Sequence, residues 1–249
     1  MNALPLASRT ALVTGAARRV GAAIASALHA VCDNVVIHYR TSRREAEALV
    51  ADFNRTRAHS AVALSAELLD LARLPQLVAE ALRTFGTLDI LVNNASSFYP
   101  TPIGEVTAAH WDDLLGSNLK APLFLSQAAA PALRKSRGLI LNLVDIHGMR
   151  PLPDHALYST AKAGLIMLTR ALARELGPEI RVNGIAPGPV MWPEGGVDET
   201  LKEEIVRKTA LKRIGSPQDV AQAAVFFATA APFVTGQILA VDGGRSLGW

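Results

Sequence analysis

Short apolar runs alternate with longer amphipathic stretches along the whole chain. The apolar runs predict strands at 10–14, 34–39, 61–66, 89–93, 139–145, 181–186 and 237–241. The longer stretches have helical periodicity and predict helices near 20–31, 43–55, 71–85, 108–134, 156–177 and 217–230. Alternating strands and helices with apolar strands are typical of an α/β protein. The pattern therefore predicts a parallel sheet of about seven strands with helices on both faces.

One region interrupts this alternation. Residues 187–216 contain the irregular string PGPVMWPEGG and a short predicted helix at 199–208. A segment of this length without regular structure is usually functional in a compact domain, so we expect it to bind substrate. No repeat, low-complexity tract or linker divides the chain, and residues 1–249 are predicted to form one domain.

The predicted helix at 156–177 is apolar around most of its circumference. Leu165, Leu168, Leu172 and Leu176 form one apolar stripe, which can cover the sheet. A second apolar side needs a second partner, so this helix predicts self-association. The alternative is a helix that is deeply covered within a single chain.

Composition and charge narrow the class of partner. Hydrophobic residues make up 50% of the 249 residues and charged residues 19%, as in a globular protein. A formal net charge of only +3 argues against nucleic acid or a membrane surface as the partner. Cys32 is the only cysteine, so no internal disulfide or thiolate metal site is expected. We see no secretory signal at 1–15 and no apolar run of membrane-spanning length, and we expect a cytoplasmic protein without a metal.

The segment 140–162, ILNLVDIHGMRPLPDHALYSTAK, contains the candidate catalytic residues. Tyr158 and Lys162 are four residues apart and therefore share one face of a helix. An ammonium beside a phenol favours the phenolate, so we expect Lys162 to lower the pKa of Tyr158 from about 10. Asp145 ends the preceding strand and is expected to turn back toward the same helix. A Tyr-x-x-x-Lys pair is weak by itself, but this context predicts an active site that transfers protons.

A turn that contains glycine, TGAARRVG at 14–21, follows the first predicted strand. Gly15 permits the tight turn, and Gly21 permits close packing of helix on sheet. The N-terminus of the next helix then offers backbone N–H groups to a pyrophosphate. Arg19 stands where such turns often have a glycine. It contacts a phosphate or the substrate, or it is a solvated surface arginine.

The end of the second predicted strand, HYRTS at 38–42, indicates which nucleotide binds. An acidic residue there would hold a ribose 2′-hydroxyl and select NAD, but no acid precedes Glu45. Arg40 and Ser42 instead offer a cation and a hydroxyl to a 2′-phosphate, which predicts NADP(H). The alternative is an ordinary polar strand exit. Glu67 follows the third strand and is placed to contact adenine.

Together these motifs resemble the short-chain dehydrogenase/reductase family over nearly the whole chain. The matching elements are TGAARRVG at 14–21, NNAS at 93–96, Asn118, Tyr158-x-x-x-Lys162, PG at 187–188 and VDGG at 241–244. The resemblance implies a single Rossmann-type, doubly wound domain that forms a homotetramer or homodimer. It implies that Tyr158 is the acid/base, that Lys162 binds the nicotinamide ribose, and that Asn118 holds a water in the proton relay. The positions expected to bind the cofactor are Gly15, Arg19, Val20, Gly21, Tyr39, Arg40, Ser42, Glu67, Leu68, Asn94, Ala95, Ser96, Tyr158, Lys162, Pro187, Gly188 and Val190.

Three departures resemble the pteridine reductase branch of that family. Asp145 replaces the usual serine, NNAS replaces the usual NNAG, and Arg19 stands in the turn. The strings HYR-x-S and NNASSFYPTP also resemble that branch. There an aromatic residue and the nicotinamide sandwich the flat pterin ring, which implies this role for Phe98. The expected substrate-binding residues are Arg19, Ser96, Phe98, Asp145, Tyr158 and Trp192, the last either lining the pocket or packing elsewhere.

The predicted reaction is NADPH-dependent reduction of a dihydropterin or dihydrofolate to the tetrahydro form. Reduction of a pterin C=N bond needs hydride at carbon and a proton at nitrogen, which a carboxyl group relays more readily than a serine hydroxyl. One alternative is a carbonyl reductase or alcohol dehydrogenase that acts on another small substrate. Another is a catalytically silent NADP(H)-binding sensor or interaction protein.

Overall fold

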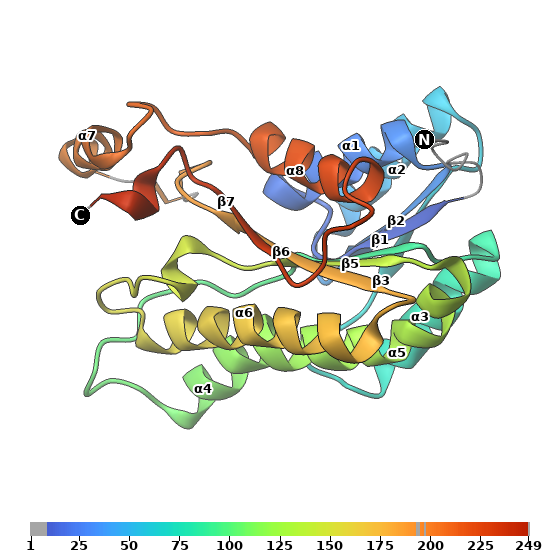
Figure 1. Cartoon of the computed structure of the whole chain (residues 1–249), viewed down its shortest axis with the longest axis horizontal. Helices are drawn as coiled ribbons and strands as arrows, with labels where there is room; N and C mark the ends of the chain where they lie inside the picture. Colours follow the sequence, from blue (N-terminus) through green and yellow to red (C-terminus); the bar gives the residue numbers. More distant parts are fainter. Residues whose placement is uncertain (1–8, 193–194, 197, 249) are drawn as a thin grey trace.

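A seven-stranded parallel sheet runs through the middle of the molecule, with helices on both faces (Figure 1). The computed structural model describes residues 9–192, 195–196 and 198–248. The strands are β1 (Thr10–Val13), β2 (Asn34–Tyr39), β3 (Ala61–Ser65), β4 (Ile90–Asn93), β5 (Leu139–Leu143), β6 (Arg181–Pro187) and β7 (Ile238–Val241). Their order is β3-β2-β1-β4-β5-β6-β7, and every neighbouring pair is parallel. The predicted α/β fold is confirmed.

Two groups of helices form the outer layers (Figure 1). One face is covered by α1 (Arg19–Val31), α2 (Arg43–Thr56) and α8 (Pro217–Thr229), the other by α3 (Arg73–Phe85), α5 (Ala121–Ser136) and α6 (Ala156–Leu176). Each face has its own apolar core. In β1, Ala11 and Val13 belong to the first core and Leu12 to the second. Because successive side chains of a strand point to opposite faces, a sheet buried on both sides needs such continuous apolar runs.

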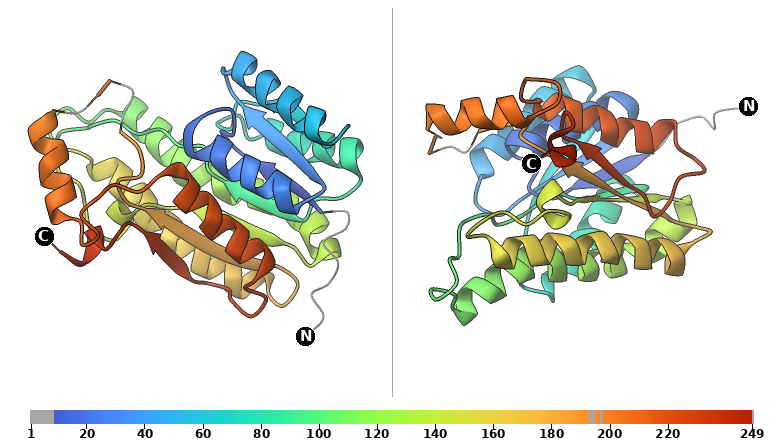
Figure 2. Two further views of the ribbon diagram at one scale, coloured as in Figure 1. Left: turned by 90° about the horizontal axis from the view of Figure 1, so that it is seen from above. Right: turned by 60° about the vertical axis from the view of Figure 1, so that its left-hand side comes forward.

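The carboxyl ends of the strands meet at one end of the molecule. β1 and β4 are neighbours there although two strands separate them in sequence. Open α/β sheets bind ligands in the crevice at such a switch in strand order. Helix α7 (Glu199–Lys208), which matches the predicted short helix, lies at the same end as the N-terminus of α6 (Figure 2).

The single helix predicted at 108–134 is interrupted. Helix α4 (Ala108–Leu115) is followed by a π-helical turn, η1 (Gly116–Lys120), and only then by α5. Gly116 allows this turn to pack tightly, because an added Cβ would lie 2.7 Å from Leu69 Cδ2. A π turn keeps the chain helical, so the hydrophobic pattern does not reveal it, but such turns often mark functional sites.

The chain after β5 also differs from the prediction. The strand ends at Leu143, and Asp145 instead caps a short 3₁₀ helix, η2 (Ile146–Gly148), by accepting a hydrogen bond from the His147 N–H. A second 3₁₀ helix, η3 (Arg245–Leu247), lies near the end of the described chain. No helix in the described ranges combines the length and apolar character needed to cross a bilayer.

Candidate active site

A cavity of about 780 Å³ lies at the carboxyl ends of the strands. The segments that follow β1, β2, β3, β4, β5 and β6 all contribute to its wall. Every residue predicted to bind cofactor or substrate lines this cavity, with the exception of Trp192. Of the four predicted catalytic residues, only Asn118 is not part of the wall, and it bonds directly to Ser97, which is.

Tyr158 and Asp145 meet inside the cavity. The Tyr158 hydroxyl donates a 2.8 Å hydrogen bond to Asp145 Oδ2, while Oδ1 accepts one from the His147 N–H. The Nζ of Lys162 lies 5.6 Å from the centroid of the Tyr158 ring and donates to the Leu143 carbonyl at 2.8 Å. The structure therefore brings the carboxylate, the phenol and the amine together as the sequence predicts.

The predicted effect of Lys162 on Tyr158 is wrong in this structure. Burial of the ring, and then the charge and hydrogen bond of Asp145, raise the pKa of Tyr158 well above its ordinary value. Burial lowers the pKa of Lys162 to about 8, and the attraction of Asp145 opposes this only in part. Tyr158 is therefore a neutral phenol that donates to Asp145 near pH 7, and not a phenolate.

Asn118 lies in the π turn, behind the cavity wall. Its side chain is 1% exposed, and its Nδ2 donates to the carbonyls of Ser97 and Leu114 at 2.9 and 3.0 Å. Its Oδ1 is buried and accepts from no donor in the described part of the chain. Because buried acceptors are nearly always satisfied, this oxygen is suited to hold a water molecule, as the predicted relay requires.

The turn after β1 excludes larger side chains at its glycines. Gly15 has a φ of +60°, and an added Cβ would lie 3.0 Å from the Ala95 Cα. At Gly21 an added Cβ would approach the Gly15 carbonyl oxygen to 2.3 Å. The Asn94 side chain donates to the carbonyls of Thr14 and Gly15 and fixes the turn. The N-terminus of α1 is thus held at the cavity wall, an arrangement that fits a dinucleotide pyrophosphate.

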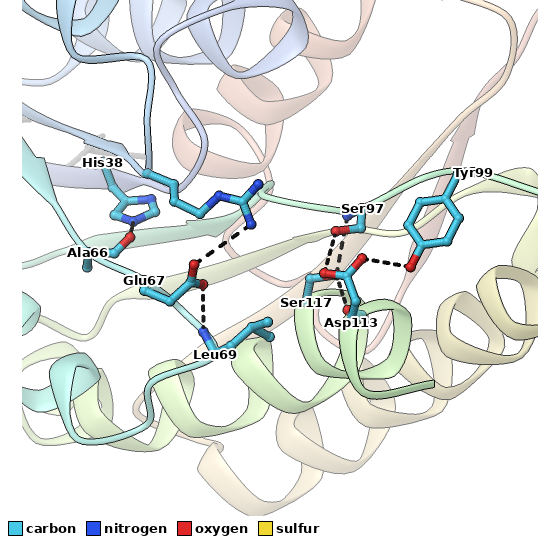
Figure 3. A network of polar contacts seen from close by, with 9 residues as sticks. His38, Ala66, Glu67, Leu69, Ser97, Tyr99, Asp113 and Ser117 are labelled. Carbon is cyan, nitrogen blue, oxygen red and sulfur yellow. Dashed lines mark hydrogen bonds and ion pairs between the residues drawn. The ribbon is translucent and has the colours of Figure 1, made fainter. Parts of the chain in front are cut away.

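His38 is hydrogen-bonded to this turn, a role that the sequence did not predict. Its Nδ1 accepts a hydrogen bond from the Gly15 N–H at 3.1 Å. Its Nε2 donates to the Ala66 carbonyl, also at 3.1 Å (Figure 3). Burial lowers its pKa to about 4, so the ring is neutral at pH 7. The available signal was a histidine within an otherwise apolar strand, next to the predicted nucleotide turn.

Arg40 and Glu67, which follow β2 and β3, form an ion pair on the cavity wall. Arg40 Nη1 lies 3.8 Å from Glu67 Oε2, and Glu67 Oε1 accepts from the Leu69 N–H at 3.0 Å. Both side chains are well exposed, at 59% and 45%. Ser42 caps α2 without a side-chain hydrogen bond to it, so its hydroxyl is not committed to the helix.

Phe98 presents an aromatic surface beside Tyr158. Its ring meets Tyr158 edge to face, with centroids 4.8 Å apart, and it is half exposed. His155 stacks on Phe98 with the same centroid distance and an interplanar angle of 19°. The predicted aromatic platform therefore borders Tyr158, and His155 covers part of it.

Arg19 and Trp192 interact through the tryptophan backbone. Arg19 lines the cavity, and its Nη2 donates to the Trp192 carbonyl at 3.1 Å. The Trp192 ring does not line the cavity; the Lys202 ammonium lies 5.9 Å from its centroid. Residues 193, 194 and 197 of the predicted substrate segment lie outside the described ranges.

Comparisons with known proteins agree with this geometry. The family described as enoyl-(acyl carrier protein) reductase matches residues 15–246. Pteridine reductase 1 of Leishmania tarentolae is 37% identical over an alignment of 278 positions, gaps included, that covers 95% of this chain and 96% of that protein. The 3-oxoacyl-[acyl-carrier-protein] reductase FabG of Staphylococcus aureus is 35% identical over 241 residues, or 95% and 98% of the two chains. The 3-oxoacyl-[acyl-carrier-protein] reductase of Synechocystis is also 35% identical, over 244 residues that cover 96% of this chain and 97% of that protein.

The chain belongs to the short-chain dehydrogenase/reductase family. It is an oxidoreductase of the kind that uses a nicotinamide cofactor. The relatives act on two chemically different substrates at nearly equal identity, so sequence identity does not choose between them.

Proposed function

We propose that this enzyme uses NADPH to reduce a dihydropterin or dihydrofolate to its tetrahydro form. The observation that carries the proposal is the 2.8 Å hydrogen bond from the Tyr158 hydroxyl to the Asp145 carboxylate, on the wall of the cavity beside Phe98. A C=N bond that accepts hydride at carbon also needs a proton at nitrogen, and a phenol joined to a carboxyl group provides one. The similarity to the Leishmania pteridine reductase supports the same substrate class.

The cavity residues fit the cofactor that this reaction needs. The turn at 15–21 would hold the pyrophosphate, Arg40 and Ser42 the 2′-phosphate, and Tyr158 and Lys162 the nicotinamide ribose. Bound NADPH would supply the hydride. Glu67, on the same wall, would contact the adenine.

The proton reaches the substrate from the Asp145–Tyr158 pair. Since the pKa of Tyr158 is raised, the phenol keeps its proton until the substrate nitrogen becomes basic. Asp145 accepts a hydrogen bond from the Tyr158 hydroxyl, so the two groups lie in one proton path. The ammonium of Lys162 and a water held on Asn118 Oδ1 would return a proton to this pair after each turnover.

Phe98 favours a flat substrate. Stacking of a heterocycle on an aromatic ring contributes about 0.5–1.5 kcal/mol beyond the burial of area. Arg19 and Ser96 also line the cavity and would contact the polar edge of the pterin.

A carbonyl reductase is the second candidate. The relatives from Staphylococcus aureus and Synechocystis are 3-oxoacyl-[acyl-carrier-protein] reductases at 35% identity, and the matched family is also described by an acyl carrier protein substrate. Such an enzyme reduces a ketone. The proton is then delivered to the oxygen of the product, whereas reduction of a pterin delivers it to a ring nitrogen.

The test is the loss of NADPH absorbance with dihydrofolate, simple dihydropterins, plain ketones and a 3-oxoacyl thioester. We expect turnover with the pterins, and a loss of kcat of about 100-fold or more in Asp145→Ala, because one proton relay is removed. The dissociation constant for NADPH should change little in that variant, and Asp112→Ala, at an exposed position of α4, should match the parent enzyme.

Turnover of ketones or thioesters without any turnover of pterins would assign the enzyme to the carbonyl reductases. NADPH binding without oxidation by any of these substrates would indicate a sensor or interaction protein instead.

We also infer that subunits associate through α6. Leu165 and Leu172 are buried within their own subunit, whereas Met167 is 61% exposed on the same helix. Sedimentation velocity tests this inference: we expect a dimer or tetramer, and a monomer in the Met167→Glu variant. A purely monomeric parent protein would contradict it.

A further inference from the structure

The loop that carries Phe98 is fastened to α4 by the side chains on either side of it. The Ser97 hydroxyl donates to Asp113 Oδ1 at 3.1 Å, and the Tyr99 hydroxyl donates to Oδ2 of the same carboxylate at 2.9 Å (Figure 3). Phe98 makes its contacts elsewhere, with the rings of Tyr158 and His155. One carboxylate therefore holds both neighbours of the aromatic residue that borders the reacting groups.

The backbone of the same loop is bound to the π turn. The Ser97 N–H donates to the Ser117 hydroxyl at 3.3 Å, and the Ser97 carbonyl accepts from Asn118 Nδ2 at 2.9 Å. The Ser117 hydroxyl in turn donates to the Asp113 carbonyl at 2.7 Å. Asp113 thus links the aromatic loop to the turn that positions Asn118.

An aspartate is suited to this place because two hydroxyl donors converge on it. A carboxylate offers an acceptor oxygen to each donor, whereas an amide offers only one. Burial and the neighbouring carboxylate raise the pKa of Tyr99 above its ordinary value, so its hydroxyl remains a donor.

We propose that Asp113 is a positioning residue: by holding Ser97 and Tyr99 it orients the Phe98 ring against Tyr158 and fixes the slot for a flat ring. The orientation of Phe98 follows from the contacts alone. The selection of a flat substrate rests on the proposed function.

The orientation is tested by ¹⁹F NMR on protein labelled with 4-fluorophenylalanine. The chain has seven phenylalanines, and Phe98→Leu identifies the resonance of interest. We expect Asp113→Ala to move the Phe98 signal toward its position in the unfolded protein, because the ring leaves the neighbouring Tyr158 and His155 rings. Asp113→Asn, which keeps one acceptor, should give a smaller shift. Asp112→Ala, the adjacent exposed aspartate, should leave the signal in place.

A second set of variants serves if Asp113→Ala does not fold. Ser97→Ala and Tyr99→Phe each remove one donor and leave the carboxylate in place. Their combination should reproduce the shift of the Phe98 signal. An unchanged signal in the folded Asp113→Ala protein, or in the combined variant, would overturn the proposal.

Kinetics test the consequence for the substrate. In Asp113→Ala we expect the KM for a dihydropterin to rise about tenfold, near the upper value of one aromatic stack, with the dissociation constant for NADPH unchanged. Adding Asp113→Ala to the Ser97→Ala/Tyr99→Phe protein should change KM little further, because the carboxylate acts through those two residues. A parent enzyme without pterin turnover would defeat the proposed function, and the fluorine signal would still decide the role of Asp113.

Discussion

Arg40 is the residue on which the proposed preference for NADPH over NADH depends. Its guanidinium lies 3.8 Å from Glu67, with both side chains well exposed, so the pair is weak and a phosphate can compete for the arginine. We expect Arg40→Ala to raise the KM for NADPH about tenfold or more, because a charge-assisted contact to the 2′-phosphate is lost. The KM for NADH, which lacks that phosphate, should change less than about twofold.

Arg43→Ala is a matched control for this prediction. Arg43 bonds Glu47 on the exposed side of α2 and does not line the cavity. Steady-state kinetics with both cofactors measure the effect. Equal increases in KM for NADPH and NADH in Arg40→Ala would remove the argument for NADP(H).

Single residues were predictable where their chemistry is visible in the sequence. Tyr158, Lys162 and Asp145 could be predicted to lie together, because the first two share one face of a helix and Asp145 closely follows a strand. The pKa of Tyr158 was predicted wrongly, since it depends on burial and on which oxygen receives its hydrogen bond. His38 and Asp113 were missed because each acts on a neighbouring loop through contacts that only the folded chain brings together.

At the scale of elements, the packing of η2 on α6 sets the distance between the acid and the phenol. Gly148 touches α6 at Lys162, and an added Cβ would lie 2.8 and 2.9 Å from the carbonyl carbon and oxygen of that residue. Both are backbone atoms, so they cannot move aside as a side chain would. We expect Gly148→Ala to displace η2, to move Asp145 away from Tyr158 and to lower kcat about 10- to 100-fold.

Gly86→Ala is the control that distinguishes the lower kcat of Gly148→Ala from a general loss of stability. Gly86 ends α3 with a φ of +78° and has no atom within 4 Å of an added Cβ. That variant should lose about 1 kcal/mol of stability with unchanged kcat. Normal turnover in a folded Gly148→Ala protein would show that η2 adapts without disturbing the pair.

The existence of the elements was predictable, but their internal geometry was not. Apolar runs located the strands of the sheet, because burial imposes that pattern on the sequence. They did not show that β5 stops at Leu143 or that a π turn separates α4 from α5. Both features depend on hydrogen bonds of the backbone, which leave the hydrophobic pattern unchanged.

For the whole molecule, His38 ties three strand ends together and makes stability depend on pH. Its pKa falls from 6.5 to about 4 on folding, chiefly through burial. The unfolded chain therefore binds a proton more readily, so stability is full above pH 6.5 and falls as the pH drops toward 4. His38 alone should lower the free energy of unfolding by about 3 kcal/mol when the pH falls below 4.

Urea unfolding at pH 7 and at pH 4.5 measures this loss in the parent and in His38→Gln. The pKa of His29 is also lowered by burial, but His29 is present in both proteins, so their difference isolates His38. We expect the variant to be less stable at pH 7 and to lose less stability on acidification. An identical loss in both proteins would contradict the prediction.

The alternation of apolar strands and amphipathic helices in the sequence was enough to predict the overall architecture. The position of the cavity could not be predicted without the order of the strands in the sheet. Seven similar apolar runs do not say which of them pair. The placement of β1 beside β4 brings the turn at Gly15 against Asn94, and it thereby joins the two halves of the site.

The π turn at 116–120 has a consequence for how this chain can tolerate insertions and deletions. Since a π turn spans one residue more than an α turn, α4 and α5 are out of phase by roughly 100°. Deleting one residue there would let α4 and α5 form one continuous α-helix. The side chain of Asn118 would then rotate away from Ser97. We therefore expect insertions and deletions of single residues to disrupt the fold more in this five-residue π turn than in surface loops.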